Sequence, residues 1–394
     1  MVYNRIGVCR MKNFIFYNPT KIVFGKGQIA RLPELILKNQ KIMMTAGGGS
    51  IQKNGVYDQV MRALEGYDIV EFWGFQPNPE YETCMEAIRK AKEEKVGFFL
   101  SVGGGSVLDA TKFIAASLCF DGEDPWDILS KGAPVQSAVP LGCILTLPAT
   151  GSESNGNAVI SRRERNQKLA FSSPEVMPRF SIIDPETTVT LDARQTANGI
   201  VDAFVHVMEQ YLTYDVNTPL QDRQAEAILQ TLIEVAPQVK ADPKVYDARA
   251  NIMWCATQAL NTLIGCGVVQ DWTTHMIGHE LTVLFGLDHA RTLAIVLPAV
   301  MRHQRVQKRD KLIQYGRRVW GIQDADPEKV IDAAIEKTIR FFESAGNPTK
   351  LSAYDIPVAD CLIAAERLSG REGKIGERQD IGREEIEAIL RLGA

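Results

Sequence analysis

The chain carries the same short pattern twice in its first third, and this repetition constrains the fold more than any other feature. An apolar segment, Lys41–Ala46, is followed by the glycine turn Gly47–Ser50 and then by a helical pattern. A second apolar segment, Val96–Val102, is followed by Gly103–Ser106 and another helical pattern. Strands that alternate with helices in this way predict a parallel sheet that is covered by helices on both faces.

Beyond about residue 190 the periodicity of the apolar residues becomes helical almost throughout. We therefore predict an α/β N-terminal domain with a parallel, Rossmann-like sheet over residues 1–190, and an all-α C-terminal domain over residues 191–394. No low-complexity linker separates them, so a ligand cleft between the two halves is expected. Further strands are expected at Cys143–Leu147 and Phe180–Ile183, and helices at Val56–Leu64, 107–118, Ala193–Leu212, Leu220–Val235, Tyr246–Ile264, Thr273–Phe285, Lys329–Ala345 and Arg383–Leu392.

The two glycine turns are candidate phosphate-binding sites. Glycine tolerates positive φ and lets a ligand approach the backbone, and the N–H groups of a first helical turn attract phosphate. Ser106 is expected to cap the second helix. Neither turn has the G-x-G-x-x-G spacing, and a single glycine run is often structural. Two runs at the same place in successive units favour ligand binding.

A third polar turn, Thr146–Asn155, follows the strand expected at 143–147. It is dense in hydroxyl and amide groups and lies where a parallel sheet presents the carboxyl ends of its strands. A capping loop and a ligand-binding loop are both compatible with this composition.

Composition excludes several classes of protein. Hydrophobic residues are 45% and charged residues 23%, with a net charge of −4, so neither a disordered chain nor a basic nucleic-acid binder is indicated. No apolar run is long enough to span a membrane, and the first ten residues lack the apolar core of a secretory signal. Met11 is a second plausible start, which would make these ten residues an extension. Seven cysteines without a CxxC pair indicate a reducing cytoplasm.

The five histidines suggest a metal site in the helical half. Asp202 and His206 are four residues apart, which places them on one helix face in an apolar segment where a carboxylate needs a partner or a cation. His275 and His279 are again four apart, and His289 follows a turn. A lone core histidine is more often a packing residue, but two such pairs favour zinc or iron(II). The residues that follow His275 do not match the motif HExxH, which excludes a zincin protease. The fifth histidine, at position 303 between arginines, is expected at the surface.

These motifs together resemble those of the iron-containing (group III) alcohol dehydrogenases. The resemblance rests on Asp202-x3-His206, on the stretch from His275 to Pro298, on GGGSVLDATK at Gly103–Lys112 and on QPNP at Gln76–Pro79. It runs from about Met11 to the C-terminus. The sequence is most similar to the butanol dehydrogenase-like branch of NADPH-dependent aldehyde reductases, which also carries a glycine turn after the first strand.

The resemblance implies a dehydroquinate synthase-like fold and one divalent ion, Fe²⁺ or Zn²⁺. It places His279 beside the nicotinamide, as a catalytic residue rather than a ligand. The uncharged turn Gly47–Ser50 favours NADP(H), since an aspartate there would repel a 2′-phosphate. The implied metal ligands are Asp202, His206, His275 and His289. The implied cofactor contacts are Gly47, Gly48, Gly49, Ser50, Asn78, Gly104, Gly105, Ser106, Asp109, Thr146, Thr150, Asn155 and Lys168.

The implied reaction is reversible hydride transfer between NADP(H) and aldehydes or primary alcohols. Its partners would be this small-molecule substrate and a second copy of the chain in a homodimer, without nucleic acid or membrane. Three alternatives stay open: a lyase or cyclase of the dehydroquinate synthase type, a polyol dehydrogenase, and a non-catalytic nucleotide- or metal-sensing module. The cyclase would need basic residues for its anionic substrate, and Asp271–His289 contains no lysine or arginine.

Overall fold

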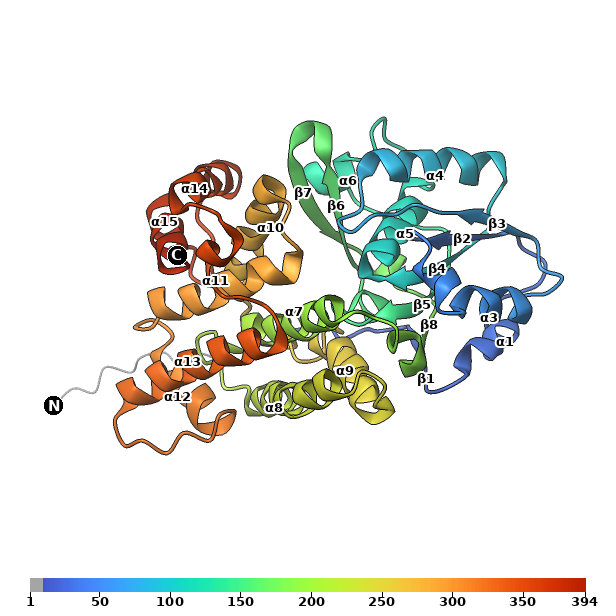
Figure 1. Ribbon diagram of the computed structural model, residues 1–394. Coiled ribbons are helices and arrows are strands. Elements are labelled where there is room, and N and C mark those ends of the chain that lie inside the picture. The colour runs from blue at the N-terminus through green and yellow to red at the C-terminus, as the bar shows by residue number, and fades with distance from the viewer. Residues whose placement is uncertain (1–9) are drawn as a thin grey trace. The chain divides into compact units, whose positions relative to one another are not determined.

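The computed structural model describes residues 10–394, which form two compact units (Figure 1). The α/β unit comprises Tyr17–Asp192 and Ala241–Thr257. The helical unit comprises residues 10–16, Ala193–Lys240 and Gln258–Ala394. The extension expected before Met11 lies, apart from residue 10, outside the described residues.

The α/β unit is built on a six-stranded sheet in which every neighbouring pair is parallel, in the order β1-β8-β5-β4-β2-β3. An antiparallel hairpin, β6–β7, stands apart from this sheet. The strands are β1 (Lys21–Phe24), β2 (Ile42–Ala46), β3 (Ile69–Phe72), β4 (Phe98–Gly104), β5 (Leu141–Leu147), β6 (Asn157–Arg162), β7 (Gln167–Ser172) and β8 (Phe180–Ile183). The helices of this part of the chain are α1 (Leu32–Leu35), α2 (Ser50–Lys53), α3 (Val56–Ala63), α4 (Tyr81–Glu93), α5 (Gly105–Ser117) and α6 (Asp127–Ser130).

Both faces of the sheet are buried. Successive strand residues point to opposite sides, so neighbouring residues of one strand contribute to different apolar cores. Met43 and Phe99 belong to one apolar core, with residues of α4, α5 and the hairpin. Their neighbours Ile42 and Leu100 belong to a second core, with residues of α1 and α3. This two-sided burial explains why the central strands read as continuous apolar runs in the sequence.

The register of the sheet brings the glycine turns together at one edge. Ala46, the last residue of β2, pairs with Val102 of β4, so the turns after these strands begin side by side. On the other side of β4, the register with β5 shifts between Gly103 and Gly104, and Gly104 pairs with Leu147. The polar turn after β5 therefore starts next to the second glycine turn. This carboxyl edge is where open parallel sheets bind ligands.

The helical unit contains long helices packed around their own apolar cores. One core is formed by α10, α11, α14 and α15, and Phe204 of α7 packs against Phe341 and Phe342 of α13. The helices of this unit are α7 (Ala193–Tyr211), α8 (Pro219–Ala241), α10 (Thr273–Phe285), α11 (His289–His303), α12 (Arg309–Arg318), α13 (Pro327–Ala345), α14 (Val358–Glu372) and α15 (Arg383–Leu392). Most of α9 (Tyr246–Ala259) belongs to the α/β unit.

The division into units differs from the predicted boundary at residue 190 in two places. Ala241–Thr257 belongs to the α/β unit, because Met253 packs in one cluster with Leu145 and Ile183 of the sheet. Residues 10–16 belong to the helical unit, where the backbone N–H of Lys12 donates to the carbonyl of Gly267.

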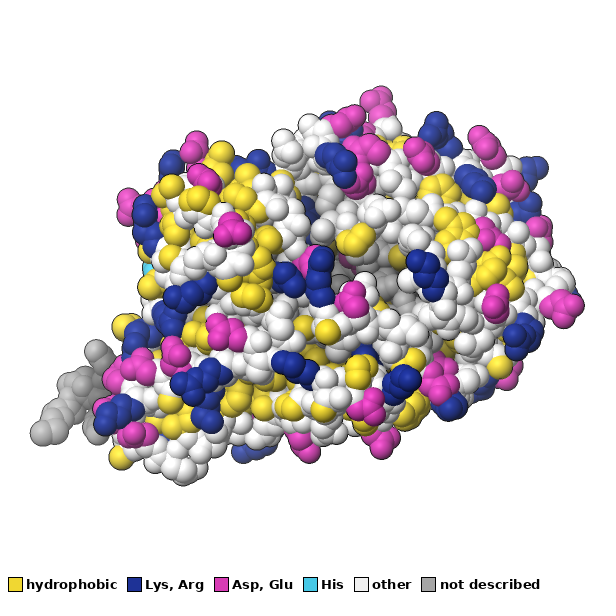
Figure 2. All heavy atoms as spheres, in the orientation of Figure 1, with side chains coloured by type: hydrophobic (Ala, Val, Ile, Leu, Met, Phe, Trp, Pro, Cys, Tyr) yellow, Lys and Arg dark blue, Asp and Glu magenta, His cyan; other side chains and the backbone are white. Residues whose placement is uncertain are grey.

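Two surface properties bear on the kinds of partner expected. Over residues 10–394, none of the helices is both long and apolar enough to cross a bilayer. On the face that Figure 2 shows, basic and acidic side chains are interspersed rather than gathered into one patch.

Candidate metal centre and cofactor-binding turns

Asp202 and His206 lie on the same face of α7, as their spacing predicted. Their side chains are almost fully buried, and His206 Nδ1 lies 3.9 Å from Asp202 Oδ1. Burial lowers the pKa of His206 to about 4, so its imidazole is neutral near pH 7. A neutral imidazole beside a buried carboxylate is suited to binding a cation.

Two further histidines reach the same carboxylate from neighbouring helices. His275 lies in the first turn of α10, and His289 begins α11 after Gly286 has ended α10 in the left-handed conformation, at φ 67°. His275 Nε2 and His289 Nε2 each lie 3.8 Å from Asp202 Oδ1. The potential ligand atoms of Asp202, His275 and His289 all lie within 4.8 Å of one another.

This cluster has the properties of a metal-binding site. His206 Nδ1 and His275 Nε2 are buried and have no hydrogen-bond partner among the described residues. Buried polar atoms of this kind are rare unless water or an ion satisfies them. Nitrogen ligands with one carboxylate suit a first-row divalent ion. His206 is not part of the 4.8 Å group, although its ring stacks on that of His275 with centroids 4.6 Å apart. Its role as a fourth ligand stays a prediction.

Glu209 is a site residue that the sequence analysis missed. It is buried on α7, and its carboxylate contacts Nδ1 of His275 and accepts hydrogen bonds from the backbone N–H groups of Thr274, at 2.6 Å, and His275, at 3.2 Å. Burial of the ring lowers the pKa of His275, but the nearby carboxylates of Glu209 and Asp202 outweigh this and raise the pKa to about 9. The signal was present in the sequence, because Glu209 follows Asp202 by seven residues, which is two helical turns along the same face.

His279 lies beside this cluster but outside it. The residue is half-buried, and its ring centroid is 5.0 Å from that of His289 and 6.3 Å from that of His275. It does not belong to the group of ligand atoms within 4.8 Å. His303, expected at the surface, is half-buried instead, with its Nδ1 3.2 Å from the side-chain nitrogen of Gln304.

The first glycine turn leaves space around its backbone. A Cβ atom added to Gly48 would have no heavy atom within 4 Å, and the residue does not lie in the left-handed region. Gly49, by contrast, has a φ of 99° and forms the N-cap of α2. Gly48 and Ser50 are exposed, so this turn presents uncharged backbone to solvent.

The second glycine turn fits closely against its surroundings. A Cβ on Gly105 would lie 2.4 Å from Oγ1 of Thr150, and one on Gly104 would lie 3.1 Å from Leu147. Helix α5 begins at Gly105, its N-cap is Gly104, and no side chain caps it. The prediction that Ser106 is the N-cap is therefore wrong, because the helix begins two residues earlier than predicted and Ser106 lies within its first turn.

The polar turn after β5 is folded onto α5. Thr146 and Asn155 are buried and Thr150 is half-buried. Asp109, a predicted cofactor contact, is also buried, and its carboxylate oxygens accept from Ser152 Oγ at 2.7 Å and from the backbone N–H of Val159 at 3.0 Å. Two other predicted contacts come together from distant segments, because Lys168 Nζ donates to Asn78 Oδ1 at 2.8 Å.

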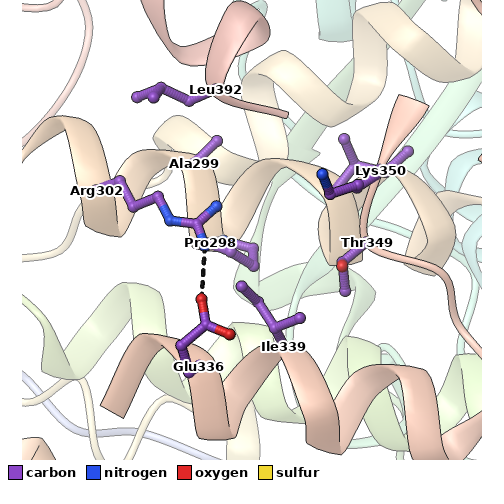
Figure 3. A pocket seen from close by; sticks show the side chains of 9 residues that line it. Pro298, Ala299, Arg302, Glu336, Ile339, Thr349, Lys350 and Leu392 are labelled. Carbon is purple, nitrogen blue, oxygen red and sulfur yellow. Dashed lines mark hydrogen bonds and ion pairs between the residues drawn. The ribbon is translucent and has the colours of Figure 1, made fainter. Parts of the chain in front are cut away.

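A separate cavity of about 290 Å³ lies in the helical unit (Figure 3). Its lining includes an ion pair of 2.9 Å between Arg302 of α11 and Glu336 of α13, together with Lys350 and apolar residues. None of the predicted site residues lines it.

Comparisons with known proteins agree with this combination of features. Residues 19–185 match the family model described as iron-containing alcohol dehydrogenase, and residues 196–393 match the C-terminal model of the Fe-containing alcohol dehydrogenase family. The NADPH-dependent aldehyde reductase YqhD of Escherichia coli is 54% identical over 94% of this chain and 97% of its own length. NADP-dependent alcohol dehydrogenase 3 of Entamoeba histolytica is 44% identical over 94% of this chain and 96% of its own.

A more distant relative and a solved structure extend the comparison. A probable NADH-dependent butanol dehydrogenase of Bacillus subtilis is 39% identical over 97% of this chain and 99% of its own. The crystal structure of YqhD from E. coli K-12 superposes with a TM-score of 0.95 at 51% identity, covering 98% of this chain and all of that one. Since both halves of the sequence match the family models, the chain belongs to the iron-containing alcohol dehydrogenase family.

Proposed function

We propose that the protein is an NADP(H)- and metal-dependent oxidoreductase that interconverts aldehydes and primary alcohols. The observation that carries the proposal is the group formed by buried Asp202 and His275 and half-buried His289, in a chain whose other unit presents two glycine turns at one edge of a parallel sheet. The relatives that are 54% and 44% identical to this chain are named as an aldehyde reductase and an alcohol dehydrogenase.

The preference for NADP(H) over NAD(H) rests on the first glycine turn. A carboxylate at this turn would repel a 2′-phosphate, and Gly47–Ser50 contains none. The relatives that are 54% and 44% identical are named for NADPH and NADP, whereas the butanol dehydrogenase at 39% is named for NADH. The binding role of the α/β unit, including the contacts predicted for Asn78, Thr146, Thr150 and Lys168, belongs to this proposal.

The metal ligands in this proposal are Asp202, His206, His275 and His289, which bind Fe²⁺ or Zn²⁺. Glu209 acts behind them, since its carboxylate keeps one proton of His275 on Nδ1, so that Nε2 is the nitrogen that binds the metal once its own proton has left. The metal-binding and catalytic role therefore falls to the helical unit.

When bound, the divalent ion polarises the substrate carbonyl and the nicotinamide supplies the hydride. The protein orients these groups and manages the proton that completes the alcohol. His279 is the proposed proton donor, because it is half-buried beside the metal cluster and imidazole is the side chain most suited to proton transfer near neutral pH. In alcohol oxidation the same ring accepts the proton.

The test is NADPH consumption with butanal as substrate, using protein stripped of metal and reloaded with iron(II), zinc or neither. We expect turnover only in the metal-loaded samples, with one NADPH oxidised per aldehyde reduced. A cyclase of the dehydroquinate synthase type or a sensing module would show no net consumption of NADPH. Glycerol and other polyols, tested in the oxidation direction, would identify a polyol dehydrogenase by a higher catalytic efficiency than butanol.

A homodimer and a cytoplasmic location complete the proposal. Met11, Phe14, Ile15 and Phe16 are apolar and exposed, and Ile15 is 94% exposed, which favours burial against a second copy. The six cysteines within the described residues are all free thiols, as a reducing compartment would keep them. Light scattering after size-exclusion chromatography tests the dimer directly.

A further inference from the structure

Lys112 is a fully buried lysine directly behind the second glycine turn. It lies on α5, two helical turns after Gly105, and has no exposed surface. A buried ammonium is costly unless hydrogen bonds and a counter-charge compensate for its lost hydration. Its partners therefore show what this side chain does.

All five acceptors of the Lys112 ammonium come from one stretch of chain, residues 152–157. Nζ lies 2.7 Å from the carbonyl of Ser152 and 2.8 Å from its Oγ. It also lies 2.8 Å from the carbonyl of Asn155, 3.2 Å from Asn155 Oδ1 and 2.8 Å from the carbonyl of Asn157. An ammonium has three protons, so these five acceptors exceed the number of its N–H groups. The loop therefore surrounds the charge.

Asp109 extends this cluster from one helical turn earlier on α5. Its Oδ1 accepts from Ser152 Oγ and its Oδ2 from the backbone N–H of Val159, so the same helix holds both ends of the loop. Within the loop, Asn155 Nδ2 donates to the carbonyl of Gly151 at 2.9 Å. The loop therefore has little freedom to change shape while Lys112 is in place.

The segment that leads into this loop packs against the second glycine turn. Thr150, two residues before Ser152, packs so closely over Gly105 that even a Cβ on the glycine would clash with it. We propose that Lys112 is a positioning residue for NADP(H), since its ammonium fixes the loop that includes Asn155 and holds Thr150 against the second glycine turn. This inference rests on the proposed function, in which that turn and loop bind the cofactor.

The substitution that tests this is Lys112→Met, which keeps most of the side-chain length and removes the charge. It would leave three buried carbonyls and Asp109 without their cation. We expect the dissociation constant for NADPH, measured by fluorescence titration, to rise by about tenfold or more, because small displacements of positioning groups have large effects. The KM for NADPH should rise with it, while metal content stays at the wild-type level because the metal cluster lies in the helical unit.

A matched control separates positioning from loss of stability. Lys311 is also a buried lysine, paired with Asp222 in the helical unit, so Lys311→Met should lower the thermal midpoint without changing the affinity for NADPH. If Lys112→Met binds NADPH as the wild type does, or if Lys311→Met weakens binding equally, the inference is wrong. A wild-type protein that binds no NADPH would instead overturn the proposed function.

A milder pair of variants keeps the inference testable if Lys112→Met does not fold. Ser152→Ala removes one acceptor of the ammonium and the donor to Asp109. Ser117→Ala removes a buried hydroxyl from α5, the helix that carries Lys112; among residues 10–394 this hydroxyl donates to the carbonyl of Phe113 and to no other group. We expect weaker NADPH binding for Ser152→Ala and wild-type binding for Ser117→Ala. Equal affinities in the two variants would contradict the positioning role.

Discussion

Replacing Glu209 by glutamine tests how the metal site is prepared, because the change keeps the shape of the side chain and reverses one hydrogen bond. The backbone N–H groups of Thr274 and His275 donate to Oε1, so the amide oxygen of a glutamine would stay with them. The NH₂ group would then face His275 Nδ1. This nitrogen would have to accept a hydrogen bond, and the ring proton would move to Nε2, the atom 3.8 Å from Asp202 Oδ1.

The size of the effect follows from this exchange of tautomers. In this tautomer Nε2 keeps its proton even when the ring is neutral, so the ring must change tautomer or reorient before it can bind the metal. Removing the hydrogen-bond partner of a histidine ligand usually weakens metal affinity by about 10- to 100-fold. This corresponds to about 1.4–2.7 kcal/mol, in the range of a hydrogen bond to a charged acceptor.

The assay is competition for Zn²⁺ against a chelator of known affinity, followed by metal analysis of the purified protein. Glu226→Gln is the matched control, because Glu226 is also a buried glutamate of the helical unit, bonded to Tyr211 and Gln314 rather than to a histidine. We expect weaker metal binding for Glu209→Gln only. Wild-type affinity in Glu209→Gln would refute the orienting role of this carboxylate.

Three further predictions test the remaining assignments. His275→Ala and His289→Ala should each lose metal and activity together, and full metal occupancy in either variant would contradict its assignment as a ligand. The wild type should use NADPH with at least about tenfold higher kcat/KM than NADH, a difference of about 1.4 kcal/mol. Gly48→Asp should reduce that ratio without unfolding the turn, since Gly48 has open space around it and an ordinary φ. His279→Ala should keep its metal and thermal midpoint while kcat falls by about 10²-fold, and metal loss in step with activity would make His279 a ligand.

The parts of the fold that sequence reasoning predicted well are those where one local pattern dominates. The strand at Phe180–Ile183 and the helices Thr273–Phe285 and Arg383–Leu392 have the predicted bounds. In each, the apolar spacing is strong and the ends are marked, as Gly286 marks the end of α10. The pairing of Asp202 with His206 succeeded for the same reason, because helix geometry alone places positions four apart on one face.

Elements whose stability comes from distant partners were not predicted. β1 and β3 are the two edge strands of the sheet, and neither is fully buried along its length, so their apolar runs are short, three residues in β1 and two in β3. The hairpin β6–β7 contains charged residues, and one of its faces packs on α5 through Ala158, Ile160 and Phe171. A half-buried strand of this kind gives a weak alternating pattern that is easily read as loop.

Two buried charged residues support the candidate sites, and both were missed in the sequence. They show why sequence patterns can identify candidate contact residues but not the residues that hold those contacts in place. Lys112 and Glu209 are each surrounded by groups from other segments, 40 to 45 positions away for the lysine and 65 to 66 for the glutamate. Each charge is surrounded by groups of opposite partial charge. Carbonyl oxygens accept from the Lys112 ammonium, and N–H groups donate to the Glu209 carboxylate. Local sequence shows that such residues sit on apolar helices, where an unpaired charge is unfavourable. Only the fold shows that each charge is satisfied by the backbone of the loop or helix start that carries the predicted contacts.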